Sequence, residues 1–110
     1  MNKKLKLVIL GAGESGVGTA ILGKKEGFEV FVSDYGKIKN NYKQVLLHQE
    51  IKWEEEVHSE TVILSADLVM KSPGIPDNAL IVLKLKEKGV AVISEIEFAA
   101  KYTTATLIGI

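Results

Sequence analysis

The chain has 110 residues, of which 46% are hydrophobic, so it is long and apolar enough for one domain with a single core but not for two. Its 14 acidic residues balance its 14 basic ones, which leaves no net charge to attract nucleic acid or an anionic membrane. No apolar run approaches the ~20 residues that span a bilayer, and the lack of cysteine excludes disulfides, thiolate metal sites and cysteine nucleophiles. We therefore expect a cytoplasmic protein without nucleic-acid partners or membrane spans.

All of the basic residues are lysines. Without arginine, the chain lacks the planar group that binds phosphate or carboxylate through two parallel hydrogen bonds. Any phosphate bound here must therefore be held by backbone N–H groups, hydroxyl groups and lysine charges.

The first half of the chain alternates short apolar runs with helical patterns. Residues 6–10 form an apolar run that glycine ends before it is long enough for a helix, which predicts a buried strand. A helix is predicted over residues 15–26, with lysines in its last turn and Gly27 as its C-terminal cap. The patterns that follow predict a strand over 29–33 with Asp34 at its end, a helix over 37–49 and a short strand over 51–57.

The second half repeats this alternation. Ser59 is predicted to cap a short helix that runs to Ala66, and Asp77 to cap a helix over 78–88 that Gly89 closes. The remaining patterns predict strands over 68–71 and 90–94, a short helix over 95–101 and a final apolar run over 106–110. Strands that alternate with helices of this length predict an α/β fold, a single Rossmann-like domain whose open parallel sheet carries helices on both faces.

The C-terminal residues are apolar and carry no polar tail. Because chain ends usually fray into polar residues, we expect the chain to be a piece of a longer protein. The domain is predicted to cover residues 1–104, with residues 105–110 beginning the connection to a further domain.

A glycine-rich loop, Gly11-Ala12-Gly13-Glu14-Ser15-Gly16, follows the first predicted strand. Gly11 permits a tight turn, Gly13 lets a ligand approach the backbone, and Gly16 lets the helix pack closely on the strand. Asp34 lies about 20 residues beyond the loop, where dinucleotide-binding domains carry a ribose-binding carboxylate. The pattern favours a bound nucleotide. The alternative is that the glycines serve packing alone and that Asp34 caps a turn.

A second loop, Ser72-Pro73-Gly74-Ile75-Pro76, follows another predicted strand. Pro73 restricts Ser72 to extended conformations, and Gly74 can adopt a positive φ and expose its N–H group. A hydroxyl beside an exposed amide can cradle an anion, although the segment alone could equally be a rigid turn. Because parallel strands end at one edge of a sheet, we expect the two loops to form two walls of one cleft.

The other polar and aromatic residues predict no chemistry of their own. His48 and His58 lack a carboxylate or cysteine pattern and are expected at the surface, and Trp53 is expected to pack in the core or at a sheet edge. Glu95 and Glu97 are interpreted as acids of a helix's first turn, and Glu54-Glu55-Glu56 as a solvated run. No metal ligand and no catalytic residue are predicted in this chain.

Taken together, the motifs resemble the N-terminal domain of the ATP-dependent Mur ligases, in particular the members that add D-glutamate. The resemblance covers essentially the whole chain, and the sister ligases that add L-alanine match less well because they usually lack the Ser-Pro-Gly segment. The matching segments are Gly11 to Gly16, Ser33-Asp34, Ala66-Asp67 with Ser72 to Ile75, Ser94 to Glu97, and Leu107 to Ile110.

The resemblance implies that the domain binds the UDP part of UDP-N-acetylmuramoyl-L-alanine. It implies that Asp34 accepts a hydrogen bond from uracil, that Glu14 and Ser15 contact the nucleotide, and that Ser72, Pro73 and Gly74 hold the diphosphate. Tyr35 and Gly36 would line the uracil site. Where better-known members carry an arginine, this chain has Tyr35-Gly36-Lys37, so that Lys37 or the Tyr35 ring would serve instead.

The same resemblance places ATP, Mg²⁺ and D-glutamate on domains other than this one. The fragment itself would then need no cofactor and would be catalytically silent, since the ligase activates a carboxylate as an acyl phosphate elsewhere. Two alternatives remain on the residues alone: an NAD-binding domain of a dehydrogenase, and a regulatory domain that senses a nucleotide without chemistry.

Overall fold

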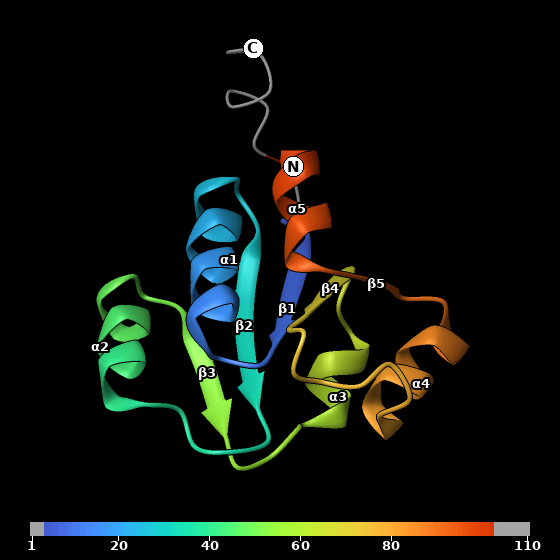
Figure 1. The fold of residues 1–110 in the computed structure, drawn as a ribbon. Coiled ribbons are helices and arrows are strands. Elements are labelled where there is room, and N and C mark those ends of the chain that lie inside the picture. The colour runs from blue at the N-terminus through green and yellow to red at the C-terminus, as the bar shows by residue number, and fades with distance from the viewer. Residues whose placement is uncertain (1–3, 103–110) are drawn as a thin grey trace.

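The computed structural model describes residues 4–102, and these form a five-stranded sheet with helices on both faces (Figure 1). All strand pairs are parallel, in the order β3-β2-β1-β4-β5. The predicted α/β class is confirmed. The elements are β1 (Lys6–Leu10), α1 (Glu14–Lys25), β2 (Glu29–Asp34), α2 (Asn40–His48), β3 (Lys52–Glu55), α3 (Glu60–Leu64), β4 (Leu68–Lys71), α4 (Leu80–Lys88), β5 (Ala91–Ile93) and α5 (Glu95–Tyr102).

The strand order creates one point where the chain reverses its direction across the sheet. From the central strand β1 the chain moves outward to β2 and β3, and then returns to place β4 on the other side of β1. The loops that leave β1 and β4 therefore diverge from neighbouring strands, whose last residues, Leu10 and Lys71, are register partners. In open α/β sheets this is where ligands bind.

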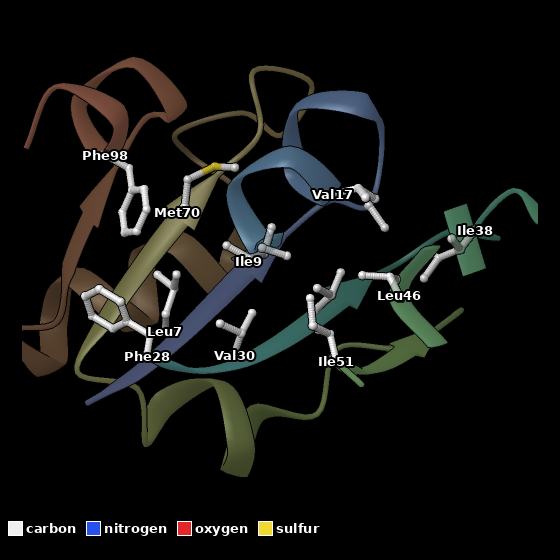
Figure 2. Close-up of a cluster of buried hydrophobic side chains, with 13 residues drawn as sticks. Leu7, Ile9, Val17, Phe28, Val30, Ile38, Leu46, Ile51, Met70 and Phe98 are labelled. Carbon is white, nitrogen blue, oxygen red and sulfur yellow. The ribbon is translucent and has the colours of Figure 1, made fainter. Parts of the chain in front are cut away.

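The central strand β1 is buried on both faces, which explains its continuous apolar run. In β1 the side chains of Leu7 and Ile9 enter a core on one face, and those of Val8 and Leu10 enter a core on the other. The first core includes Val17 of α1, Leu46 of α2 and Phe98 of α5 (Figure 2). The second is formed with α3 and α4 through Ile63, Ile81, Val82 and Leu85.

Three predicted helix ends can be compared with the structure besides Asp77. Ser59 is the N-cap of α3 as predicted, although its side chain makes no capping bond and the helix ends at Leu64, not Ala66. Gly27 and Gly89 adopt φ values of 94° and 88° after α1 and α4, as their predicted capping roles require. The prediction that Asp77 caps α4 is wrong, because the helix begins at Leu80 and Ala79 is its N-cap. Residues 76–79 form a turn closed by Ala79 N–H on Pro76 O at 3.1 Å, and Asp77 pairs with Lys71 instead.

Other predicted boundaries differ from the observed ones by a few residues. The predicted helix over 37–49 is shorter at its start, since Ile38 lies in the loop and is held there by Glu55. None of the helices within residues 4–102 has the length and apolar character to cross a membrane. The predicted run over 106–110, and the domain boundary at residue 104, lie outside the described residues.

Candidate functional site

A cavity of about 660 Å³ opens at the carboxyl edge of the sheet, where β1 and β4 end. Both predicted loops line it, together with the end of β2 and the start of α4. This confirms that the two loops form walls of one cleft. The predicted residues among its lining are Gly11, Gly13, Ser15, Asp34, Tyr35, Ser72 and Gly74.

The two loops touch at Gly11, and only glycine fits there. Gly11 has a φ of 101°, and a Cβ atom on it would lie 2.7 Å from Ser72 Oγ. Ser72 in turn donates its N–H to Leu10 O at 3.0 Å and its hydroxyl to Gly11 O at 3.3 Å. The tight turn predicted for Gly11 therefore also lets the second loop approach.

The other two glycines of the first loop have the predicted surroundings. A Cβ atom on Gly16 would lie 1.8 Å from Gly11 O, so Gly16 permits α1 to start close against the loop. No atom lies within 4 Å of where a Cβ on Gly13 would be, which leaves the backbone open to a ligand. Gly74 does not have the positive φ that the sequence allowed for it.

The start of α1 offers backbone donors to this cleft. Gly13 is the N-cap and has no side chain to accept from the first turn, and the first helical hydrogen bond runs from Val17 N–H to Gly13 O at 2.9 Å. The N–H groups of residues 14–16 therefore precede the helical ladder. Together with the positive end of the helix dipole, these groups are able to attract an anion.

Asp34 ties the first loop to the end of β2. Its Oδ2 accepts from Ala12 N–H and its Oδ1 from Gly36 N–H, each at 2.8 Å. This is the turn-capping role that the sequence left open, and Asp34 nevertheless lines the cavity. Because each carboxylate oxygen has two lone pairs, both atoms can still accept a bond from a ligand.

His58 is a residue of the cleft that the sequence analysis missed. It lines the cavity and its ring stacks on that of Tyr35, with centroids 5.2 Å apart and planes 15° apart. The expectation of a surface histidine is wrong, because His58 is half-buried and its Nδ1 lies 2.7 Å from the fully buried Ser33 Oγ. Burial lowers the pKa of His58, although the nearby Glu54 and Asp34 charges act in the opposite direction.

The prediction that Glu54-Glu55-Glu56 is a solvated run is also wrong for its first two residues. Glu54 accepts from Ser33 Oγ and Ser59 N–H, and Glu55 accepts from Ile38 N–H and Lys43 Nζ. Burial raises the pKa of Glu54, but these hydrogen bonds outweigh it and hold that pKa below its usual value. The one sequence signal was Ser33, a polar residue in an apolar strand, which is the register partner of Glu54.

Some predicted residues lie beside the cavity without lining it. Glu14, Gly36 and Lys37 are exposed, and Pro73 lines a separate hollow of about 330 Å³ next to Lys71. Lys71 stabilises the second loop, because its Nζ donates a hydrogen bond to Ile75 O at 2.6 Å. Within residues 4–102, no group of three or more histidine, aspartate or glutamate side chains is placed to hold a metal ion.

The predictions for Trp53 and Glu97 are confirmed. Trp53 is partly buried and packs against the first core. Glu97 lies in the first turn of α5, where its Oε1 accepts from Ser94 N–H at 2.9 Å and Ser94 Oγ accepts from Glu97 N–H at 3.1 Å. This is a capping box, so these acids serve helix formation.

The same fold is found in solved structures of ligases. A pseudomurein peptide ligase type C from Methanothermus fervidus superposes with a TM-score of 0.77 and 28% identity, over 90% of this chain and 20% of that one. A UDP-N-acetylmuramate-alanine ligase from Thermotoga maritima gives a TM-score of 0.76 at 18% identity, over 92% of this chain and 23% of that one. The second similarity shows the fold alone.

Curated relatives are more similar in sequence. A UDP-N-acetylmuramoylalanine–D-glutamate ligase of Christiangramia forsetii is 63% identical over 105 residues, which are 96% of this chain and 24% of the relative. The ligase of the same name from Bacteroides thetaiotaomicron is 58% identical over 103 residues, which are 94% of this chain and 23% of the relative. The chain thus spans about a quarter of the length of these relatives.

The family model described as the MurD N-terminal domain matches residues 4–80. This segment contains both loops of the cleft, Asp34 and the residues that support it. The chain therefore belongs to the family of the MurD N-terminal domain.

Proposed function

We propose that this chain binds the UDP part of UDP-N-acetylmuramoyl-L-alanine, as the N-terminal domain of a ligase that adds D-glutamate during peptidoglycan synthesis. The observation that carries the proposal is the cleft itself. It lies at the reversal point of a parallel sheet, both of its loops come from the segment that matches the family, and two relatives of high identity are named as D-glutamate ligases.

The chemistry of the cleft suits a nucleoside diphosphate. The backbone N–H groups of Glu14 and Ser15, at the start of α1, are donors for one phosphate, and Ser72 and Gly74 line the same cavity from the second loop. At the end of β2, Asp34 can accept from an N–H group of a base, beside the aromatic ring of Tyr35. We propose that the diphosphate lies between the two loops and that uracil lies against Asp34 and Tyr35.

The rest of the reaction is proposed for parts of a full-length ligase that are not in this chain. There, ATP and Mg²⁺ would activate the alanyl carboxylate as an acyl phosphate, and D-glutamate would attack it. A cytoplasmic location belongs to the same proposal. The chain alone is expected to bind the uridine nucleotide and to catalyse nothing.

A titration with two ligands tests this function against the dehydrogenase alternative. The chain is titrated with UDP and with NADH by isothermal calorimetry under the same conditions. We expect weak but saturable UDP binding and no NADH binding, because the segment that contains Asp34 and both loops matches the MurD N-terminal domain. Tight binding of NADH without a response to UDP would refute the proposal.

A substitution locates the nucleotide within the cleft. Ser72→Ala removes the hydroxyl where the two loops meet. It is expected to weaken the binding of UDP by about 1 kcal/mol, the usual value of one hydrogen bond. Ser65→Ala is the matched control, because that exposed hydroxyl donates to Val62 O on α3 and does not line the cavity. Equal UDP affinities for wild type and Ser72→Ala would place the diphosphate elsewhere.

A further inference from the structure

The side chain of His58 is one end of a hydrogen-bond network that runs through Ser33 to Glu54. Ser33 Oγ lies 2.7 Å from Glu54 Oε2 and 2.7 Å from His58 Nδ1. A hydroxyl has one proton, so it can donate to only one of these partners and must accept from the other. The ionised Glu54 carboxylate can only accept. Ser33 therefore donates to Glu54, and Nδ1–H of His58 donates to Ser33.

Further contacts hold the other end of this network, Glu54 and Ser33, in place. Glu54 also accepts from Ser59, through the backbone N–H at 2.7 Å and the hydroxyl at 2.5 Å. Ser33 is fully buried, and it and Glu54 are register partners on the adjacent strands β2 and β3. The sheet therefore fixes both the tautomer and the orientation of the His58 ring.

The His58 end of the network reaches the cleft through Tyr35. Tyr35 is 76% exposed, and one face of its ring stacks on the His58 ring, with the centroids 5.2 Å and the planes 15° apart. Both residues line the cavity, next to Asp34. An aromatic ring that is open on one face and supported on the other is a surface on which a nucleobase can stack.

We propose that His58 is a positioning residue of the nucleotide site: held by Ser33 and Glu54, it fixes the Tyr35 ring so that the base of the nucleotide stacks on the free face of that ring. This inference rests on the proposed function, since it takes the ligand to be a nucleoside diphosphate.

The affinity for UDP tests this role. His58→Ala and Tyr35→Ala are each expected to raise the Kd for UDP about tenfold, the effect of losing one stacked base. The double variant is expected to bind no more weakly than about the weaker single variant, because the two rings act as one unit. His48→Ala on α2 is the matched control and should bind UDP as the wild type does, since His48 is exposed and does not line the cavity.

Two nuclear magnetic resonance readouts separate positioning from a merely structural role. In the wild type we expect ring protons of Tyr35 to give intermolecular NOEs to uracil H5 and H6, and His58→Ala to lose them. Long-range ¹⁵N–¹H spectra should show neutral His58 protonated at Nδ1 and bare at Nε2. The opposite tautomer would overturn the donation order and with it the proposal.

The possible outcomes are distinguishable. If the wild type binds UDP and His58→Ala binds it equally well, the inference fails and the proposed function stands, even if the variant is less stable to urea. If the wild type does not bind UDP, the proposed function fails and this inference fails with it.

Discussion

The substitution Gly16→Ala tests how closely α1 must approach the first loop. The added Cβ would lie 1.8 Å from the backbone oxygen of Gly11, and real Cβ atoms essentially never come within 3.0 Å of such a neighbour. Backbone must therefore move, and that same oxygen accepts the hydroxyl of Ser72. Overpacking against backbone costs about 3 kcal/mol, and the better helix propensity of alanine returns about 1 kcal/mol. We expect a net loss of about 2 kcal/mol in the free energy of unfolding.

Gly18→Ala, one half-turn further along α1, is the matched control. A Cβ atom there meets nothing within 4 Å, so only the propensity term remains, and we expect a gain of about 1 kcal/mol. Urea denaturation monitored by circular dichroism measures both variants against the wild type. If Gly16→Ala were as stable as Gly18→Ala, the close approach of helix and loop, and the role given to Gly16, would be refuted.

Two further predictions concern the pH and a helix cap. Burial lowers the pKa of His58, so the unfolded chain takes up a proton near the ordinary value of 6.5 before the folded chain does, and the free energy of unfolding should fall as the pH drops below 6.5. His58→Gln should flatten this fall in urea titrations at successive pH values, and an unchanged slope would contradict the assignment. Ser94→Ala should cost about 1 kcal/mol of unfolding free energy by removing half of the capping box of α5, with Ser65→Ala as the control for an exposed serine; equal stabilities would refute the cap.

Much of the fold could be predicted because its patterns are local. The β1 run of apolar residues ends at Gly11, whose positive φ no other residue adopts readily, and Gly27 and Gly89 mark helix ends in the same way. The two loops could be placed at one cleft because parallel strands end at one edge. These inferences need only sequence periodicity and the geometry of a parallel sheet.

The buried polar chain could not be predicted, since it depends on register between strands. His58, Ser33 and Glu54 are up to 25 residues apart in the sequence, and only the pairing of β2 with β3 brings them together. A run of three glutamates reads as solvated when its neighbours across the sheet are unknown. The bond from Ala12 N–H to Asp34 could not be predicted either, because it joins the first loop to the end of β2, 22 residues further along the sequence.

The most direct test of the central claim is to locate UDP on the chain. In ¹⁵N–¹H spectra of the labelled protein, titration with UDP is predicted to shift the amide signals of residues 14–16, Asp34, Tyr35, Ser72 and Gly74, at the cavity where β1 and β4 end. The signals of residues at the opposite edge of the sheet, such as Lys52 at the start of β3, should stay in place. Shifts confined to that opposite edge, or to the far faces of the helices, would contradict the assignment of the cleft as the nucleotide site.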